Sequence, residues 1–224
     1  MSNTKQTNES GEKVVEVLSK TEQFLEKNKK RIFYGMLAVI IIAAAFFLYH
    51  RYIAVPKQKE AIAQTFVAEQ NFRNDNFEVA LNGDGNNLGF KQIIKEYGNN
   101  AGSAVYFYAG VCELQLGKYK EALDYLKQYS GKDKIISARA ICCMGDAYAG
   151  LGENKKAVEY YEKAANYADN IFTAGYLMKA GIMYEELGNK EAALKAYNTI
   201  QDNYPQSPEG YEIGKYISRL QINK

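Results

Sequence analysis

The chain has 224 residues, a formal net charge of +2 and a single histidine, His50. The long C-terminal part is nearly neutral and has no basic stripe, which excludes the electrostatic pattern of a nucleic-acid-binding protein. It also has no histidine for a Ser-His-Asp triad or a Cys-His pair, and no glycine-rich phosphate loop. We therefore expect no enzyme activity, no cofactor and no metal site.

Residues 1–31 form a short charged tail. Residues 1–11 are polar and poor in hydrophobic residues, a composition typical of disorder. From Glu12 onward, apolar residues recur at helical spacing, at Val14, Val17, Leu18, Phe24 and Leu25. The spacing predicts a short amphipathic helix, which lies on a membrane surface, pairs with a partner helix or extends frayed into solvent.

The next stretch, residues 32–49, reads IFYGMLAVIIIAAAFFLY and carries no charge. As a helix it would span roughly 27 Å, close to the thickness of a bilayer's hydrocarbon core. A buried core helix would keep a polar face, and a signal peptide would not follow some thirty residues of charged tail. The pattern therefore predicts an uncleaved, single-pass transmembrane anchor over residues 32–53, with Tyr34, Tyr49 and Tyr52 at its edges.

The orientation of this anchor follows from its flanking charges. Residues 12–31 carry six lysines and arginines, and residues 50–73 carry four. Because positive flanks stay in the cytoplasm, we expect a cytoplasmic N-terminus and an external C-terminal domain. The chain has three cysteines, Cys112, Cys142 and Cys143. Because their number is odd and none forms a CxxC pair, we expect them to be free and buried. Free thiols suit the cytosol better than an oxidising exterior, which weighs against this orientation.

Residues 54–102 are predicted to hold a linker helix and a degenerate helical repeat. Pro56 predicts a break, after which a helix over residues 57–73 carries the apolar positions Ala61, Phe66, Ala68 and Phe72. The loop at residues 82–87, NGDGNN, has the alternating oxygen-bearing side chains of a calcium loop. An EF-hand would need Gly and Glu where the chain has Asn87 and Ile93, so we expect a turn.

Three segments of residues 103–206 align without gaps, at offsets of 35 and 36 residues. They start at Ser103, Ala138 and Ala174. Each has a glycine at its eighth position, a Leu-Gly pair seven residues later and an alanine five residues after that pair. The positions are Gly110, Gly145 and Gly181; Leu116-Gly117, Leu151-Gly152 and Leu187-Gly188; Ala122, Ala157 and Ala193. The first glycine allows two helices to approach closely, and the second ends a helix with a positive φ angle.

This spacing resembles the tetratricopeptide repeat, in which helix pairs stack into a solenoid. The resemblance implies an all-α fold: one transmembrane helix, then one degenerate repeat, three clear repeats and a capping helix over residues 207–224. Ser207 is expected to cap that last helix, which would run through Leu220. Its expected buried face comprises Tyr211, Gly214, Ile217 and Ser218.

Tetratricopeptide arrays bind partners on the concave face, at the second, fifth, ninth and twelfth positions of each first helix. Carried onto this chain, the resemblance implies a partner-binding groove of twelve residues. They are Ala104, Phe107, Val111 and Leu114; Arg139, Cys142, Asp146 and Ala149; Gly175, Met178, Ile182 and Glu185. Arrays that hold a C-terminal carboxylate carry Lys and Asn at the fifth and ninth positions, and this chain does not. The mostly apolar groove predicts an amphipathic helix or an extended hydrophobic segment as partner, and the alternative is that some of these residues pack against the capping helix.

The whole arrangement of tail, anchor, NGDG loop and repeats resembles the YfgM-type membrane proteins of bacteria, over about residues 12–222. That resemblance implies an ancillary subunit of the SecYEG translocon in the bacterial inner membrane, with a periplasmic repeat domain. The implied protein partners are translocon subunits, an envelope chaperone or exported chains. The alternative function is a self-associating envelope scaffold, of the cell-division or outer-membrane assembly coordinator type.

Overall fold

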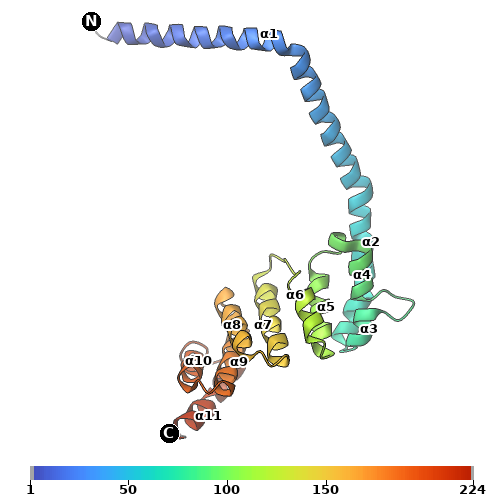
Figure 1. The fold of residues 1–224 in the computed structure, drawn as a ribbon, viewed down its shortest axis with the longest axis vertical. Helices are drawn as coiled ribbons and strands as arrows, with labels where there is room; N and C mark the ends of the chain where they lie inside the picture. Colours follow the sequence, from blue (N-terminus) through green and yellow to red (C-terminus); the bar gives the residue numbers. More distant parts are fainter. Residues whose placement is uncertain (1–2, 223–224) are drawn as a thin grey trace. The chain divides into compact units, whose positions relative to one another are not determined.

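The computed structural model describes residues 3–222, and the side chains of residue 22, residues 25–98 and residues 100–222. Every regular element in this range is helical (Figure 1). The elements are α1 (Asn3–Tyr49), a π-helical turn (His50–Ala54), α2 (Val55–Arg73), α3 (Phe77–Asn82), α4 (Phe90–Tyr97), a 3-10 turn (Gly98–Ala101), α5 (Ala104–Gln115), α6 (Tyr119–Leu126), α7 (Lys134–Gly150), α8 (Asn154–Tyr167), α9 (Thr173–Glu186), α10 (Lys190–Asn203) and α11 (Pro208–Ile222). The chain divides between Pro56 and Lys57 into two units.

The N-terminal unit is one long helix, α1, followed by the π-helical turn. Residues 3–11, expected to be disordered, are part of α1; once a helix exists, each added residue gains a hydrogen bond. Met1 and Ser2 lie outside the described residues, as do the side chains of the expected amphipathic face before Glu22. Among the residues that the structure describes, one helix, near the N-terminus, is long and apolar enough to span a membrane, and none of its most apolar window is buried.

Pro56 does not break the helix, contrary to expectation. It is the second residue of α2, directly after the π-helical turn His50–Ala54. A proline ring clashes with the carbonyl four residues earlier and lacks an N–H, so an ordinary α-helix would kink there. The wider π turn relieves this crowding, and helical backbone continues from α1 into α2.

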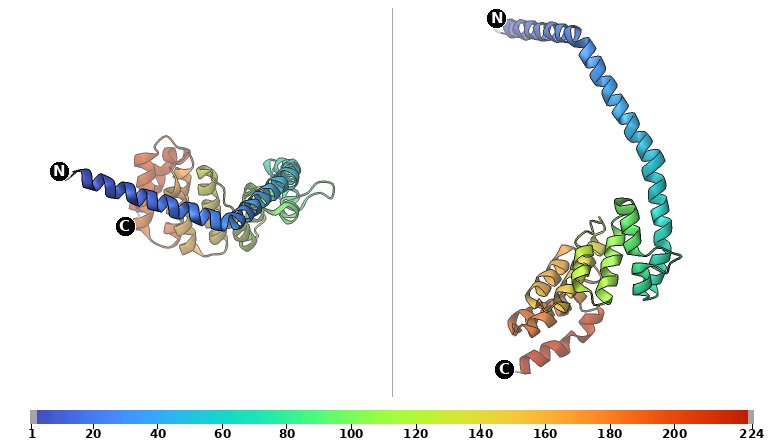
Figure 2. Two further views of the ribbon diagram at one scale, coloured as in Figure 1. Left: turned by 90° about the horizontal axis from the view of Figure 1, so that it is seen from above. Right: turned by 45° about the vertical axis from the view of Figure 1, so that its right-hand side comes forward.

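The C-terminal unit, from Lys57 onward, is built on three stacked helix pairs: α5 with α6, α7 with α8, and α9 with α10 (Figure 2). We call these repeats 1, 2 and 3. Their predicted close approach is confirmed at the first glycine of each repeat. A Cβ atom on Gly110, Gly145 or Gly181 would lie 2.6, 2.7 or 2.2 Å from Leu126, Tyr161 or Tyr197, respectively.

The predicted helix-ending glycines and crossing alanines are also confirmed. Gly117, Gly152 and Gly188 have φ angles of +74°, +73° and +71°, which side-chain-bearing residues rarely adopt. The alanines that follow them, Ala122, Ala157 and Ala193, are completely buried. Each repeat is therefore one helix, a tight left-handed turn and a second helix, as the spacing predicted.

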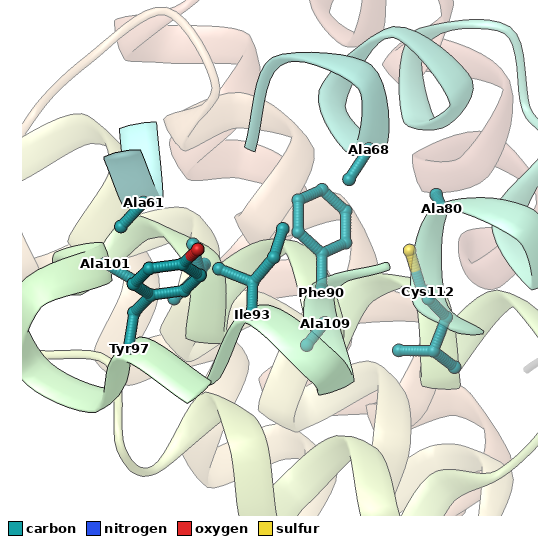
Figure 3. Packing of buried hydrophobic residues seen from close by; sticks show 11 residues of the cluster. Ala61, Ala68, Ala80, Phe90, Ile93, Tyr97, Ala101, Ala109 and Cys112 are labelled. Carbon is teal, nitrogen blue, oxygen red and sulfur yellow. The ribbon is translucent and has the colours of Figure 1, made fainter. Parts of the chain in front are cut away.

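Helices α2, α3 and α4 form a core with the first helix of repeat 1 (Figure 3). Phe90 and Ile93 of α4 are fully buried, and the Phe90 ring points toward Ala68 of α2. Of the apolar positions of α2, Ala61 and Ala68 are buried and Phe66 is 63% exposed; the polar residue Thr65 is also buried. The buried residues of α2, Ala61, Thr65 and Ala68, are all small, and the Thr65 hydroxyl donates to the Ala61 carbonyl at 2.7 Å.

A buried ion pair joins α4 to α5. The Glu113 side chain is fully buried, and the Lys91 Nζ atom lies 2.6 Å from its Oε1 atom. Neither carboxylate oxygen of Glu113 has a well-formed hydrogen bond in the described chain, so the contact with Lys91 is an ion pair. Burial acts to lower the pKa of Lys91, but the combined effect of the Glu113 carboxylate, with smaller contributions from Tyr125 and Glu78, outweighs burial and raises it.

The capping helix, α11, begins as predicted. The Ser207 hydroxyl accepts from the Gly210 N–H at 2.9 Å, and Pro208 takes the first helical position. Its expected buried face was wrong except at Ile217: Tyr211, Gly214 and Ser218 are exposed. The face that packs on repeat 3 follows the apolar spacing i, i+3, i+4, i+7, at Ile213, Tyr216, Ile217 and Leu220.

Candidate functional site

A hollow of about 940 Å³ lies within the C-terminal unit, and we call it the groove. Its walls come from the end of α2, from α5, α7 and α9, from the turn before α9 and from the first residues of α11. The lining residues are Glu69, Phe72, Arg73, Ala104, Phe107, Tyr108, Val111, Leu114, Gln115, Ile136, Arg139, Cys142, Cys143, Asp146, Ile171, Phe172, Gly175, Tyr176, Lys179, Pro208 and Glu209.

Eight of the twelve residues expected to form the groove line it: Ala104, Phe107, Val111, Leu114, Arg139, Cys142, Asp146 and Gly175. The other four, Ala149, Met178, Ile182 and Glu185, do not line it. Repeats 1 and 2 thus contribute as expected, and repeat 3 contributes mainly through its first turns.

The apolar wall of the groove belongs to α5. Phe107, Val111 and Leu114 follow one another at helical spacing, but they differ in burial. Phe107 is only 7% exposed and packs with Leu126 and Ala140 in the core between repeats 1 and 2. Val111 and Leu114 are half-buried, so they are the side chains of this stripe that a partner can touch.

The polar side of the groove is a bridge between repeats 2 and 3. Asp146 of α7 accepts from the Tyr161 hydroxyl at 2.8 Å and from Lys179 Nζ of α9 at 2.6 and 2.8 Å. Burial acts to lower the pKa of Lys179, but the neighbouring Cys142 and Asp146 side chains outweigh burial and raise it. Asp146 is therefore held by two partners of its own chain.

A similar bridge joins repeat 3 to the capping helix. Glu185 accepts from the Tyr197 hydroxyl at 2.6 Å and from Arg219 Nη2 of α11 at 2.7 and 2.8 Å. Met178 packs against the cluster that contains Ile213 and Ile217. These contacts explain why the second half of α9 does not line the groove, since α11 engages it.

The sequence reasoning missed several residues of the groove. Ile171 and Phe172, in the turn before α9, are 81% and 37% exposed, and the Arg139 guanidinium lies 5.1 Å from the Phe172 ring centre. An Ile-Phe pair in a turn, where polar residues are usual, was a signal that could have found them. The contribution of α2, through Phe72 and Arg73, had no signal in the repeat pattern because α2 lies outside it.

The side chains of the groove are suited to binding a partner. Among the residues the structure describes, no three His, Cys, Asp or Glu side chains come together to hold a metal ion. Burial, with a smaller effect of Asp146, raises the pKa of the Cys143 thiol to about 12. This thiol therefore stays protonated near neutral pH and is a poor nucleophile.

Family models of the tetratricopeptide repeat match three segments of the chain: one model at residues 104–132 and 176–207, and a second at residues 138–170. The chain carries tetratricopeptide repeats. The matched segments correspond to repeats 1, 3 and 2, so the sequence models and the helix pairs agree. A comparison with curated proteins gave no match. Proteins with tetratricopeptide repeats generally mediate protein–protein interaction.

Proposed function

We propose that this protein is a membrane-anchored adaptor that binds another polypeptide in the groove. The observation that carries the proposal is the half-buried stripe of Val111 and Leu114, open to a hollow of about 940 Å³. A partner that buries its own apolar side chains there gains about 25 cal/mol for each Å² of apolar surface removed from water. The mechanism is reversible burial, so the adaptor holds a partner without altering it.

The anchor is the apolar part of α1. All but one side chain of residues 32–49 is exposed, and no part of the described chain covers them. Eighteen uncharged residues without a protein neighbour are stable in a hydrocarbon environment, where helical backbone groups are already hydrogen-bonded. The flanking charges favour a cytoplasmic N-terminus, and this orientation would leave the repeats outside the cytoplasm.

The partner class that best fits this arrangement is the export machinery of a bacterial inner membrane. The likeness in sequence pattern to the YfgM-type proteins supports it, as does the combination of an apolar N-terminal helix with tetratricopeptide repeats in one chain. In this role the groove would hold a translocon subunit, an envelope chaperone or a newly exported chain.

The test is photo-crosslinking in intact membranes from two positions. A photoreactive amino acid at Val111 reports on the groove, and one at Glu159, exposed on α8 outside the groove, is the matched control. We expect adducts with translocon subunits, a chaperone or exported chains from Val111 and few from Glu159. Equal adducts from both positions, or adducts only with unrelated proteins, would contradict the proposal.

A second candidate function is a self-associating scaffold, favoured by Ile62 and Phe66. These apolar side chains lie one turn apart on α2 and are 60% and 63% exposed. A second copy, anchored in the same membrane, could cover them. Phe66→Glu separates the two candidates, because a scaffold assembled through this face of α2 would change oligomeric state and an adaptor would still crosslink from Val111.

A further inference from the structure

Two of the three cations that line the groove are neutralised within the chain. Lys179 pairs with Asp146 at 2.6 Å, and Arg73 Nη2 lies 3.4 Å from Glu69. Arg139, exposed on α7, has no carboxylate within ion-pairing distance in the described chain. Its guanidinium stacks on the Phe172 ring, a contact that orients the charge without neutralising it.

Each carboxylate that lines the groove is already stabilised within the chain, by a cation or by a helix dipole. Glu69 and Asp146 have the partners named above. The third, Glu209, lies in the first turn of α11, where the helix dipole stabilises a negative charge. The guanidinium of Arg139 is therefore the charge that a bound partner could neutralise.

A hydroxyl group without a hydrogen-bond partner also lines the groove. Tyr176 of α9 lines the groove and is only 5% exposed, and its hydroxyl makes no hydrogen bond in the described chain. Burial, with a smaller effect of Cys142, raises the pKa of this hydroxyl, and the positive charge of Arg139 opposes that rise. The Tyr176 and Arg139 side chains both line the groove. A buried donor without an acceptor is unfavourable, and an oxygen from a partner would relieve it.

We propose that the groove binds a polypeptide segment that presents apolar side chains together with an Asp or Glu side chain, and that Arg139 pairs with that carboxylate. The apolar side chains pack on Val111 and Leu114 of α5, and the acidic one reaches across to α7. This inference rests on the proposed function, because it names the chemistry of the partner that the groove accepts.

The experiment is a selection from random 12-residue peptides displayed with both ends joined to a carrier, so that no free C-terminus is present. The bait is the full chain in detergent, as wild type, Arg139→Glu or Lys134→Glu. Lys134→Glu makes the same charge change on the same helix, outside the groove. We expect wild type and Lys134→Glu to enrich apolar peptides with Asp or Glu, and Arg139→Glu to enrich Lys or Arg at that place.

Binding of one wild-type-selected peptide then gives the magnitude. Arg139→Gln should weaken it about tenfold, as expected for the loss of one charge-assisted hydrogen bond. Identical acidic motifs from wild type and Arg139→Glu would overturn the inference, as would acidic enrichment only in a library with free C-termini. If Val111→Asp, with unchanged circular dichroism, binds every selected peptide as well as wild type does, the groove is not the binding site and the proposed function itself fails.

Discussion

At the scale of single residues, the buried pair of Lys91 and Glu113 is the interaction whose loss we expect to cost most. Glu113 is fully buried, and Lys91 is its one ion-pair partner in the described chain. Lys91→Met would leave a carboxylate uncompensated between α4 and α5, and we expect it to lower the free energy of unfolding by about 3–5 kcal/mol. Urea unfolding followed by circular dichroism measures this loss.

The double variant Lys91→Met/Glu113→Met is the control, because replacing both charges removes the desolvation cost and should restore most of the stability. The pH dependence has a defined sign. Since the pKa of Lys91 is raised in the folded protein, the stabilisation is complete below its usual value of about 10.4 and is lost as the pH rises above it. A double variant as unstable as Lys91→Met would contradict this account.

At the scale of helices, the glycines of the repeats are the most sensitive positions. A Cβ atom at Gly145 would lie 2.7 Å from the Tyr161 ring, so Gly145→Ala must push α7 and α8 apart. We expect a loss of about 1–3 kcal/mol in the free energy of unfolding. Gly214→Ala is the matched control: Gly214 lies mid-helix in α11 with nothing within 4 Å, and alanine there should stabilise by about 0.5–1 kcal/mol. Equal effects of the two changes in urea unfolding would show that close packing at Gly145 is not the cause.

The sequence was sufficient to predict the elements whose causes are local. Gly117 and its equivalents end helices because of their own φ angles, and Gly110 marks a crossing because a fixed spacing brings Leu126 against it. The sequence was not sufficient to predict the backbone at Pro56 or the buried face of α11. At Pro56, the π turn that accommodates the ring leaves no mark in the residue pattern. On α11, Tyr211 and Ile213 both fit a helical stripe, and only packing on repeat 3 decides that Ile213 is buried and Tyr211 is 77% exposed.

At the scale of the whole molecule, the same distinction between local spacing and long-range packing explains which residues of the groove the sequence predicted. Its α5 and α7 walls follow from repeat positions and were predicted. Its other lining residues include Phe72 of α2 and Glu209 of α11. These two helices lie outside the repeat pattern, and only folding of the chain brings them to the same hollow. Only the second half of α9 is closed off, by the bridge from Arg219 to Glu185, a contact between residues 34 positions apart that no local spacing implies.

The two units of the chain should also differ in whether they need detergent to stay in solution. The C-terminal unit has its own buried clusters, whereas the apolar side chains of residues 32–49 have no protein partner. Deletion of residues 1–53 should therefore give a protein that stays in solution without detergent and keeps the helical circular dichroism of the repeats. Deletion of residues 1–30 is the matched control: it removes charge but keeps the apolar stretch, so that variant should still require detergent. The measurement is the fraction in the supernatant after ultracentrifugation. A full-length chain that remains there without detergent would contradict the anchor, because roughly eighteen exposed apolar residues are too many for a soluble helix without a partner.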